Sequence, residues 1–142
     1  MSTFAWVGGA RRRTWLRTAP VGAVALLLSV CAWADGLRPD AAQVRGAYDS
    51  GATFVDVRTD AEWSAGHLER AVHLPVADVD AGAAAALPKK DLPIVLYCVS
   101  GRRAEAAAES LWRQGYTQVT AMIGGYADLK AAGFPVAEGP AQ

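Results

Sequence analysis

The residues best suited to chemistry form one short loop. Cys98 ends an apolar run and is followed by five residues that lead into a helical pattern: Val99, Ser100, Gly101, Arg102 and Arg103. Gly101 permits a positive φ, so the loop can turn consecutive backbone N–H groups inward as a cradle for an anion. Such donors, a helix N-terminus and nearby guanidinium groups favour a thiolate and lower a cysteine pKa from about 8.5 to between about 3.5 and 7.5. We therefore predict that Cys98 is a nucleophile that needs no histidine base.

Two arginines at the start of a helix require an explanation. A helix N-terminus carries partial positive charge, so each cation there costs a few tenths to about 1 kcal/mol. A negative group is expected to offset this cost, and the Cys98 thiolate or an oxyanionic substrate beside it would do so. Alternatively, Arg102 and Arg103 are solvated or pair with carboxylates, for which the candidates are Asp56, Glu62 and Glu105.

Short apolar segments alternate with helical patterns along the chain. Strands are expected at residues 53–57, 71–75, 92–98 and 117–122. Helices are expected at residues 39–48, 102–114 and 126–132, whereas residues 78–87 fit either a helix or a loop. A further helical turn is expected to begin at Thr59 or Asp60 and to end at Gly66. In the helix at 102–114, Leu111 and Trp112 share the expected buried face with three alanines.

This alternation of elements predicts an α/β fold. Apolar strands separated by helices are typical of a central, mostly parallel sheet that is covered by helices on both faces, which makes three layers. In such sheets, ligands bind beyond the carboxyl ends of the strands. Cys98 occupies one of these ends, so the expected topology and the expected chemistry agree.

The first 34 residues have the pattern of a secretory signal peptide. Four arginines lie in the first 17 residues, an apolar run covers residues 19–30, and an A-x-A site follows at residues 32–34. The apolar run falls short of the about 20 residues that span a bilayer. We therefore expect cleavage after Ala34, a mature domain at residues 35–142, and a periplasmic protein. It would meet the membrane only during export, by the Sec or the twin-arginine route.

Composition and cysteine count narrow the function further. The chain has 14 basic and 14 acidic residues and is 52% hydrophobic, which argues against a disordered protein or a nucleic-acid-binding surface. Cleavage after Ala34 would remove Cys31 and leave Cys98 without an intramolecular disulfide partner. A leftover thiol in an exported protein is either buried and structural or reactive. Lipidation of Cys31 is the alternative at the N-terminus.

Several motifs in order resemble those of single-domain rhodaneses. They are residues 54–58 (FVDVR), 62–63 (EW), 66–68 (GHL), 71–75 (AVHLP), the Cys98 loop, 115–116 (GY), 124–125 (GG) and 132–135 (AGFP). The resemblance covers residues 39–136, which is nearly all of the expected mature chain. Among exported members, the chain is most similar to the periplasmic, phage shock protein E-like thiosulfate sulfurtransferases.

The resemblance implies a reaction in two steps. The Cys98 thiolate takes the outer sulfur of thiosulfate as a persulfide, and a thiophilic acceptor such as cyanide or a thiol then removes it. Backbone N–H groups from Val99 to Arg103 would stabilise the charged sulfur, Arg102 would bind the sulfonate end, and Arg58 would assist. The resemblance implies neither a metal nor an organic cofactor. We also expect no nucleic-acid partner and a monomer or weak dimer.

Other functions remain to be weighed against this one. Tyrosine phosphatases use a Cys-x5-Arg loop, but here Arg103 follows Cys98 after four residues and Ala104 takes the next position, which disfavours phosphatase chemistry. A non-catalytic sulfur-carrier or protein-binding module stays open. His67 and His73 lack further cysteine or histidine partners, so a zinc site is not expected.

The chain departs from the rhodanese pattern at two positions. Ala104 stands where many relatives have serine, which removes one hydroxyl group near the loop. Tyr126 follows the paired glycines where relatives often have tryptophan, and we interpret this as a change in packing.

Overall fold

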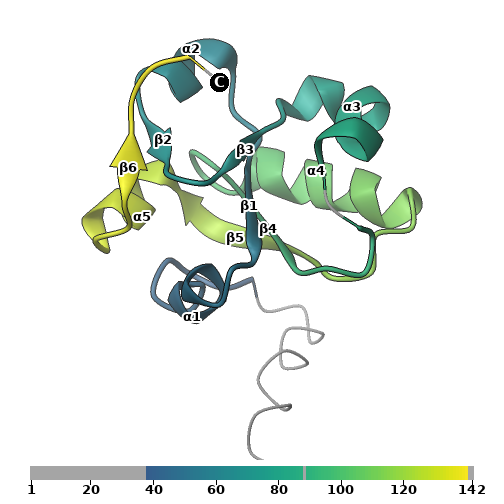
Figure 1. Ribbon diagram of the computed structural model, residues 1–142, viewed down its shortest axis with the longest axis horizontal. Coiled ribbons are helices and arrows are strands. Elements are labelled where there is room, and N and C mark those ends of the chain that lie inside the picture. Colours follow the sequence, from purple (N-terminus) through teal and green to yellow (C-terminus); the bar gives the residue numbers. More distant parts are fainter. Residues whose placement is uncertain (1–37, 88, 141–142) are drawn as a thin grey trace, which may run out of the picture. The chain divides into compact units, whose positions relative to one another are not determined.

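A parallel four-stranded sheet organises the domain, as the computed structural model shows for residues 38–87 and 89–140 (Figure 1). Its strands, in spatial order, are β3 (Val72–His73), β1 (Thr53–Asp56), β4 (Ile94–Cys98) and β5 (Val119–Gly125). All three strand pairs are parallel, and every residue of β4 is buried. Continuous burial explains why β4 is the most uniformly apolar strand in the sequence.

Helices cover both faces of this sheet. On one face, α3 (Val79–Ala86) and α4 (Arg102–Arg113) pack on a buried cluster that includes Leu96 and Leu111. On the other face, α1 (Arg45–Asp49) and α5 (Tyr126–Ala131) pack on a cluster that includes Tyr97 and Leu129. The predicted α/β fold with a mostly parallel sheet and helices on both faces is therefore confirmed.

Several element boundaries differ from the sequence-based expectation. Residues 41–44 form turns, and the α-helix begins only at Arg45. The ambiguous segment at 78–87 is mostly helical, as α3. The expected burial of Trp112 is wrong: 53% of this residue is exposed, whereas its neighbour Leu111 is fully buried. One residue turns a helix by about 100°, so Trp112 lies beyond the edge of the alanine-lined face.

A second, smaller sheet was not expected from the sequence. β2 (His67–Leu68) pairs antiparallel with β6 (Val136–Ala137). Two residues per strand are too few to show an alternating pattern. Helix α2 (Asp60–Ser64) precedes β2, and its N-terminus is closed by a capping box in which Thr59 and Glu62 bind each other's backbone N–H groups.

A short 3-10 helix (Val76–Asp78) links β3 to α3. Among the described residues, no helix has both the length and the apolar character that crossing a membrane requires. The predicted signal peptide at residues 1–34 lies outside the described residues.

Candidate active site

Cys98 lies at the carboxyl end of β4 and is almost completely buried, with 1% of its surface exposed. The Gly101 N–H donates to its Sγ atom over 3.1 Å. Burial alone would raise the pKa of this thiol. Four backbone N–H groups act against burial, and together they lower the pKa of Cys98. They belong to Ala104, Ser100, Gly101 and Arg103. Hydrogen bonds to the charged form are the stronger influence here, so the loop is built to hold a thiolate.

The backbone of the loop takes its shape from two glycines. Gly101 has φ of +87° and forms the N-cap of α4. Gly125, at the end of β5, approaches so closely that a Cβ there would collide with the carbonyl oxygens of Cys98 and Val99. The loop therefore rests directly on β5, while Val99 and Ser100 are exposed.

Arg103 is held by an ion pair with Glu62 of α2. Both guanidinium Nη atoms donate to the two carboxylate oxygens, each over 2.8 Å. The hydrogen bond from Arg103 lowers the pKa of Glu62 to about 2. The same hydrogen bond raises the pKa of Arg103, and the nearby Cys98 thiolate raises it further. Pairing with Glu62 was the alternative that the sequence left open for Arg103. The carboxylate thereby fixes a cation beside the sulfur.

Arg102 is placed differently from its neighbour. It is the first residue of α4, its side chain is exposed, and it makes no ion pair with any residue in 38–87 or 89–140. The predicted substrate-binding roles of the loop residues Val99 to Arg103 stay predictions.

Arg58 lies at the end of β1 but is engaged in structural contacts. Its Nε and Nη2 atoms donate to the Asp56 carboxylate, the shortest contact being 2.6 Å, and Nη2 also donates to the Gly66 carbonyl over 2.6 Å. Arg58 is 4% exposed and Asp56 is fully buried. The assignment of Arg58 to substrate binding stays a prediction, and these contacts with Asp56 and Gly66 favour a structural role.

The sequence of the chain matches one protein family over most of its length. The model of the rhodanese-like domain matches residues 40–132, which is well over half of the chain. The chain belongs to the rhodanese-like domain family.

Named relatives of this rhodanese-like domain include enzymes. The thiosulfate sulfurtransferase PspE of Escherichia coli is 33% identical over 76 residues, which are 54% of this chain and 72% of the relative. The Arabidopsis thaliana mitochondrial protein HIGH ARSENIC CONTENT 1 is 31% identical over 105 residues, which are 67% of this chain and 62% of the relative. The chain thus spans less than two thirds of the Arabidopsis protein.

Solved structures agree with this relationship. A crystal structure of the Alr3790 protein from Anabaena has a TM-score of 0.64 and 27% identity, and covers 70% of this chain and 80% of that one. A structure described as rhodanese with anions from E. coli has a TM-score of 0.54 and 31% identity, and covers 63% of this chain and all of that one.

The two histidines of this rhodanese-like domain enclose an aromatic stack. The Trp63 ring lies 3.5 Å from the His67 ring and 4.7 Å from the His73 ring, centroid to centroid. His67 Nδ1 and His73 Nε2 each bind a backbone carbonyl over 3.0 Å, that of Trp63 and that of Arg58 respectively. The described residues contain no cluster of three or more His, Cys, Asp or Glu that could bind a metal ion.

Tyr126 occupies a packing position beside Arg58. The Arg58 guanidinium lies 4.5 Å from the centroid of the Tyr126 ring, and the Tyr126 hydroxyl group fills the space where Gly66 would otherwise carry a Cβ. The change from the tryptophan that relatives often have therefore affects how the end of β1 is covered.

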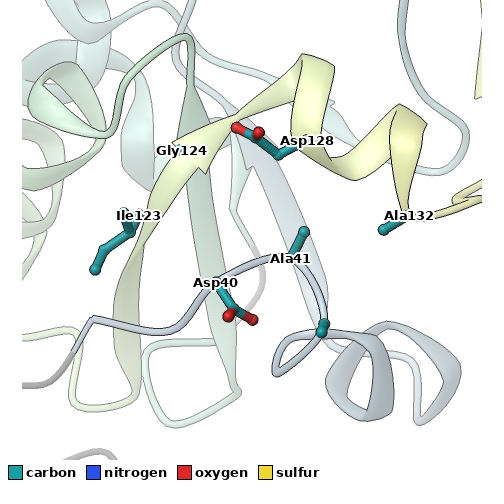
Figure 2. Close-up of a pocket in the computed structure, with 7 residues that line it drawn as sticks. Asp40, Ala41, Ile123, Gly124, Asp128 and Ala132 are labelled. Carbon is teal, nitrogen blue, oxygen red and sulfur yellow. The ribbon is translucent and has the colours of Figure 1, made fainter.

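An open depression of ≈ 380 Å³ lies near the end of β5, and Figure 2 shows residues from the segment before α1, from β5 and from α5 around it. Its lining residues are Asp40, Ala41, Ala42, Ile123, Gly124, Asp128 and Ala132. Cys98 is absent from this lining. The Asp128 carboxylate there accepts the Gly125 N–H over 2.8 Å, so it caps α5.

Sequence reasoning missed one residue that touches the loop. Arg38 Nη1 donates to the Gly101 carbonyl over 3.3 Å and to Glu105 over 2.8 Å. The residues in these contacts are 63 and 67 positions apart, and no local pattern marks Arg38 as a partner of the loop.

Proposed function

We propose that this rhodanese-like domain is a thiosulfate sulfurtransferase that works through a persulfide on Cys98. The convergence of backbone N–H groups on the Cys98 sulfur is the observation that supports the proposal most directly. Donors fixed in this way stabilise negative charge on sulfur without reorganisation during the reaction, which is a major source of catalysis at oxyanion-type sites.

In the first half-reaction, the Cys98 thiolate attacks the outer sulfur of thiosulfate. A bond forms between the two sulfurs, the sulfur–sulfur bond of thiosulfate breaks, and its electron pair leaves with sulfite. In the second half-reaction, an acceptor such as cyanide or a thiolate attacks the outer sulfur, and the electron pair of the persulfide bond returns to Cys98. In this scheme the negative charge on the protein moves from Cys98 Sγ to the outer sulfur of the persulfide and back, beside the loop N–H groups that stabilise it.

The two arginines have different tasks in this scheme. Arg102 is exposed and makes no ion pair among residues 38–87 and 89–140, so it is available for the sulfonate oxygens of the donor. Arg103 is bound by Glu62, so its guanidinium adds fixed positive charge beside Cys98. A guanidinium suits this work because it stays protonated and presents several donors in a plane.

The proposal is tested by the intact mass of the purified protein. Incubation with thiosulfate is expected to add one sulfur atom, and subsequent cyanide is expected to remove it as thiocyanate. Cys98→Ala should gain no sulfur under the same conditions. Failure to load sulfur on a folded protein with a free, reactive Cys98 would reject thiosulfate as the donor and favour a carrier or binding module.

We also propose that the domain works in the periplasm after removal of residues 1–34. The support is the arginine-rich start, the apolar run and the A-x-A site of the sequence. Expression of the full chain, followed by cell fractionation and N-terminal mass analysis, should find a periplasmic protein that begins at Asp35. An uncleaved protein in the cytoplasm would contradict this proposal.

A further inference from the structure

Arg38 contacts the Cys98 loop (residues 98–103) but lies outside the rhodanese motifs. Its Nη1 atom donates to the Gly101 carbonyl over 3.3 Å, and the guanidinium lies 3.3 Å from the position that a Gly101 Cβ would take. The same Nη1 atom donates to Glu105, one turn into α4, over 2.8 Å. One guanidinium therefore contacts both the loop and the first turn of the helix.

The backbone beside Arg38 is itself anchored. The Ile123 N–H donates to the Pro39 carbonyl over 2.8 Å, which ties this segment to β5. The Arg38 side chain is 30% exposed, so it is partly shielded by the surfaces that it joins. Arg38 thus links β5, the loop and α4 at the position of Gly101.

Gly101 needs such external support. A glycine at φ of +87° has no side chain to restrict its backbone, and alternative conformations are open to it. Its N–H nevertheless has to point at Cys98 Sγ, 3.1 Å away, while its carbonyl starts the helix by accepting the Glu105 N–H over 3.0 Å. Arg38 is a second donor to the Gly101 carbonyl, and it restricts rotation of the peptide that joins Gly101 to Arg102.

We infer that Arg38 is a positioning residue for the Cys98 thiolate: its guanidinium fixes the peptide between Gly101 and Arg102 and adds positive charge next to the loop. The inference rests on the proposed function, in which the thiolate is the reacting group. A fixed Gly101–Arg102 peptide holds the start of α4, where the Arg103 and Ala104 N–H groups lower the pKa of Cys98. A cation beside the loop also favours the charged thiolate. Both effects act on ionisation of Cys98.

The test is the pH dependence of Cys98 alkylation by iodoacetamide, quantified by mass spectrometry of the peptide that carries Cys98. Only the thiolate reacts, so the midpoint of the profile reports the ionisation of Cys98. Arg38→Met is expected to move the midpoint up by about half to one pH unit, which slows alkylation about threefold to tenfold below the midpoint. Arg38→Lys should restore part of the shift, because it keeps the charge but loses the planar fork.

Glu105→Gln provides the matched control. It removes the same ion pair but leaves Arg38 and its bond to Gly101, so the midpoint should not rise. An equal rise in Glu105→Gln and Arg38→Met would overturn the inference, because the ion pair would then carry the effect. An unchanged midpoint in Arg38→Met, or in Arg38→Gln if the methionine variant does not fold, would overturn it too.

Alkylation needs no sulfur donor, so the result separates two questions. A raised midpoint in Arg38→Met alongside sulfur loading of the unsubstituted protein supports both proposals. A raised midpoint without any sulfur loading supports the positioning role of Arg38 and rejects the proposed function.

Discussion

The ends of β1 and β4 lie side by side in the sheet, where Asp56 is in register with Tyr97, yet they are built in opposite ways. At the end of β1, Asp56 and Arg58 are buried and bind each other. At the end of β4, several N–H groups converge on one thiol, and the neighbouring Arg102 is exposed. Charges that neutralise each other hold a fold together, whereas donors directed at a single reactive atom prepare it for a reaction. The same edge of one sheet therefore has a structural half and a chemical half.

Asp56→Asn should damage the structural half and produce the largest effect on stability. It leaves the buried Arg58 guanidinium without its carboxylate, which costs about 3–5 kcal/mol in the free energy of unfolding. Urea denaturation measures this loss. Replacing both partners, as in Asp56→Leu with Arg58→Met, should recover most of it. A loss below 1 kcal/mol for Asp56→Asn would show that the pair does not hold the end of β1.

Gly125→Ala should disturb the contact between β5 and the chemical half. The backbone φ of −168° suits alanine, so the effect is purely steric, and the new methyl group collides with the Cys98 and Val99 carbonyls. We expect a loss of about 1–3 kcal/mol together with slower alkylation of Cys98. Gly46→Ala in α1 is the control, because nothing lies within 4 Å of its Cβ position and alanine favours the helix. Normal alkylation in Gly125→Ala would contradict the close packing of the loop.

Arg102→Gln should weaken the chemical half without affecting the fold. In the proposed reaction Arg102 binds the sulfonate of the donor, so its loss is expected to slow sulfur loading from thiosulfate about tenfold, which corresponds to about 1.4 kcal/mol. Stability should change by less than about 0.5 kcal/mol, because the side chain is exposed. Arg113→Gln, at the other end of α4, should load sulfur at the normal rate. Equal rates for the two variants would exclude Arg102 from donor binding.

Glu62→Gln should have the smallest effect and a characteristic dependence on pH. The hydrogen bond from Arg103 lowers the pKa of Glu62 from 4.5 to about 2, so the ion pair stabilises the fold above about pH 4.5 and is lost as the pH falls toward 2. Both side chains are 32% exposed, which limits the contribution to about 1 kcal/mol. The difference in unfolding free energy between the unsubstituted protein and Glu62→Gln should therefore shrink as the pH falls from 4.5 to 2. A constant difference would show that the Glu62 charge is not involved.

The sequence carried enough information to place the chemical half. An apolar run followed by a glycine and a helical pattern marks a strand end, which is where parallel sheets bind ligands, so Cys98 and its loop could be located in advance. The contacts that position the loop could not be located in the same way. The Arg38–Gly101 and Glu62–Arg103 contacts join residues 63 and 41 positions apart, and only the folded topology brings them together. Periodicity also assigned Trp112 to the interior, because it does not show where a packed face ends.

The burial of Cys98 has a consequence for the order in which reagents can gain access. Cys98 is 1% exposed before loading, so in the proposed cycle only a narrow molecule can reach its sulfur. Loading would add one atom at a sulfur–sulfur bond length of about 2 Å, which moves the reactive centre that far from Cys98 Sγ. The resting protein would then discriminate by size, and the loaded protein would be open to bulkier thiols. A large thiol reagent that fails to label the resting protein should release sulfur from the loaded one.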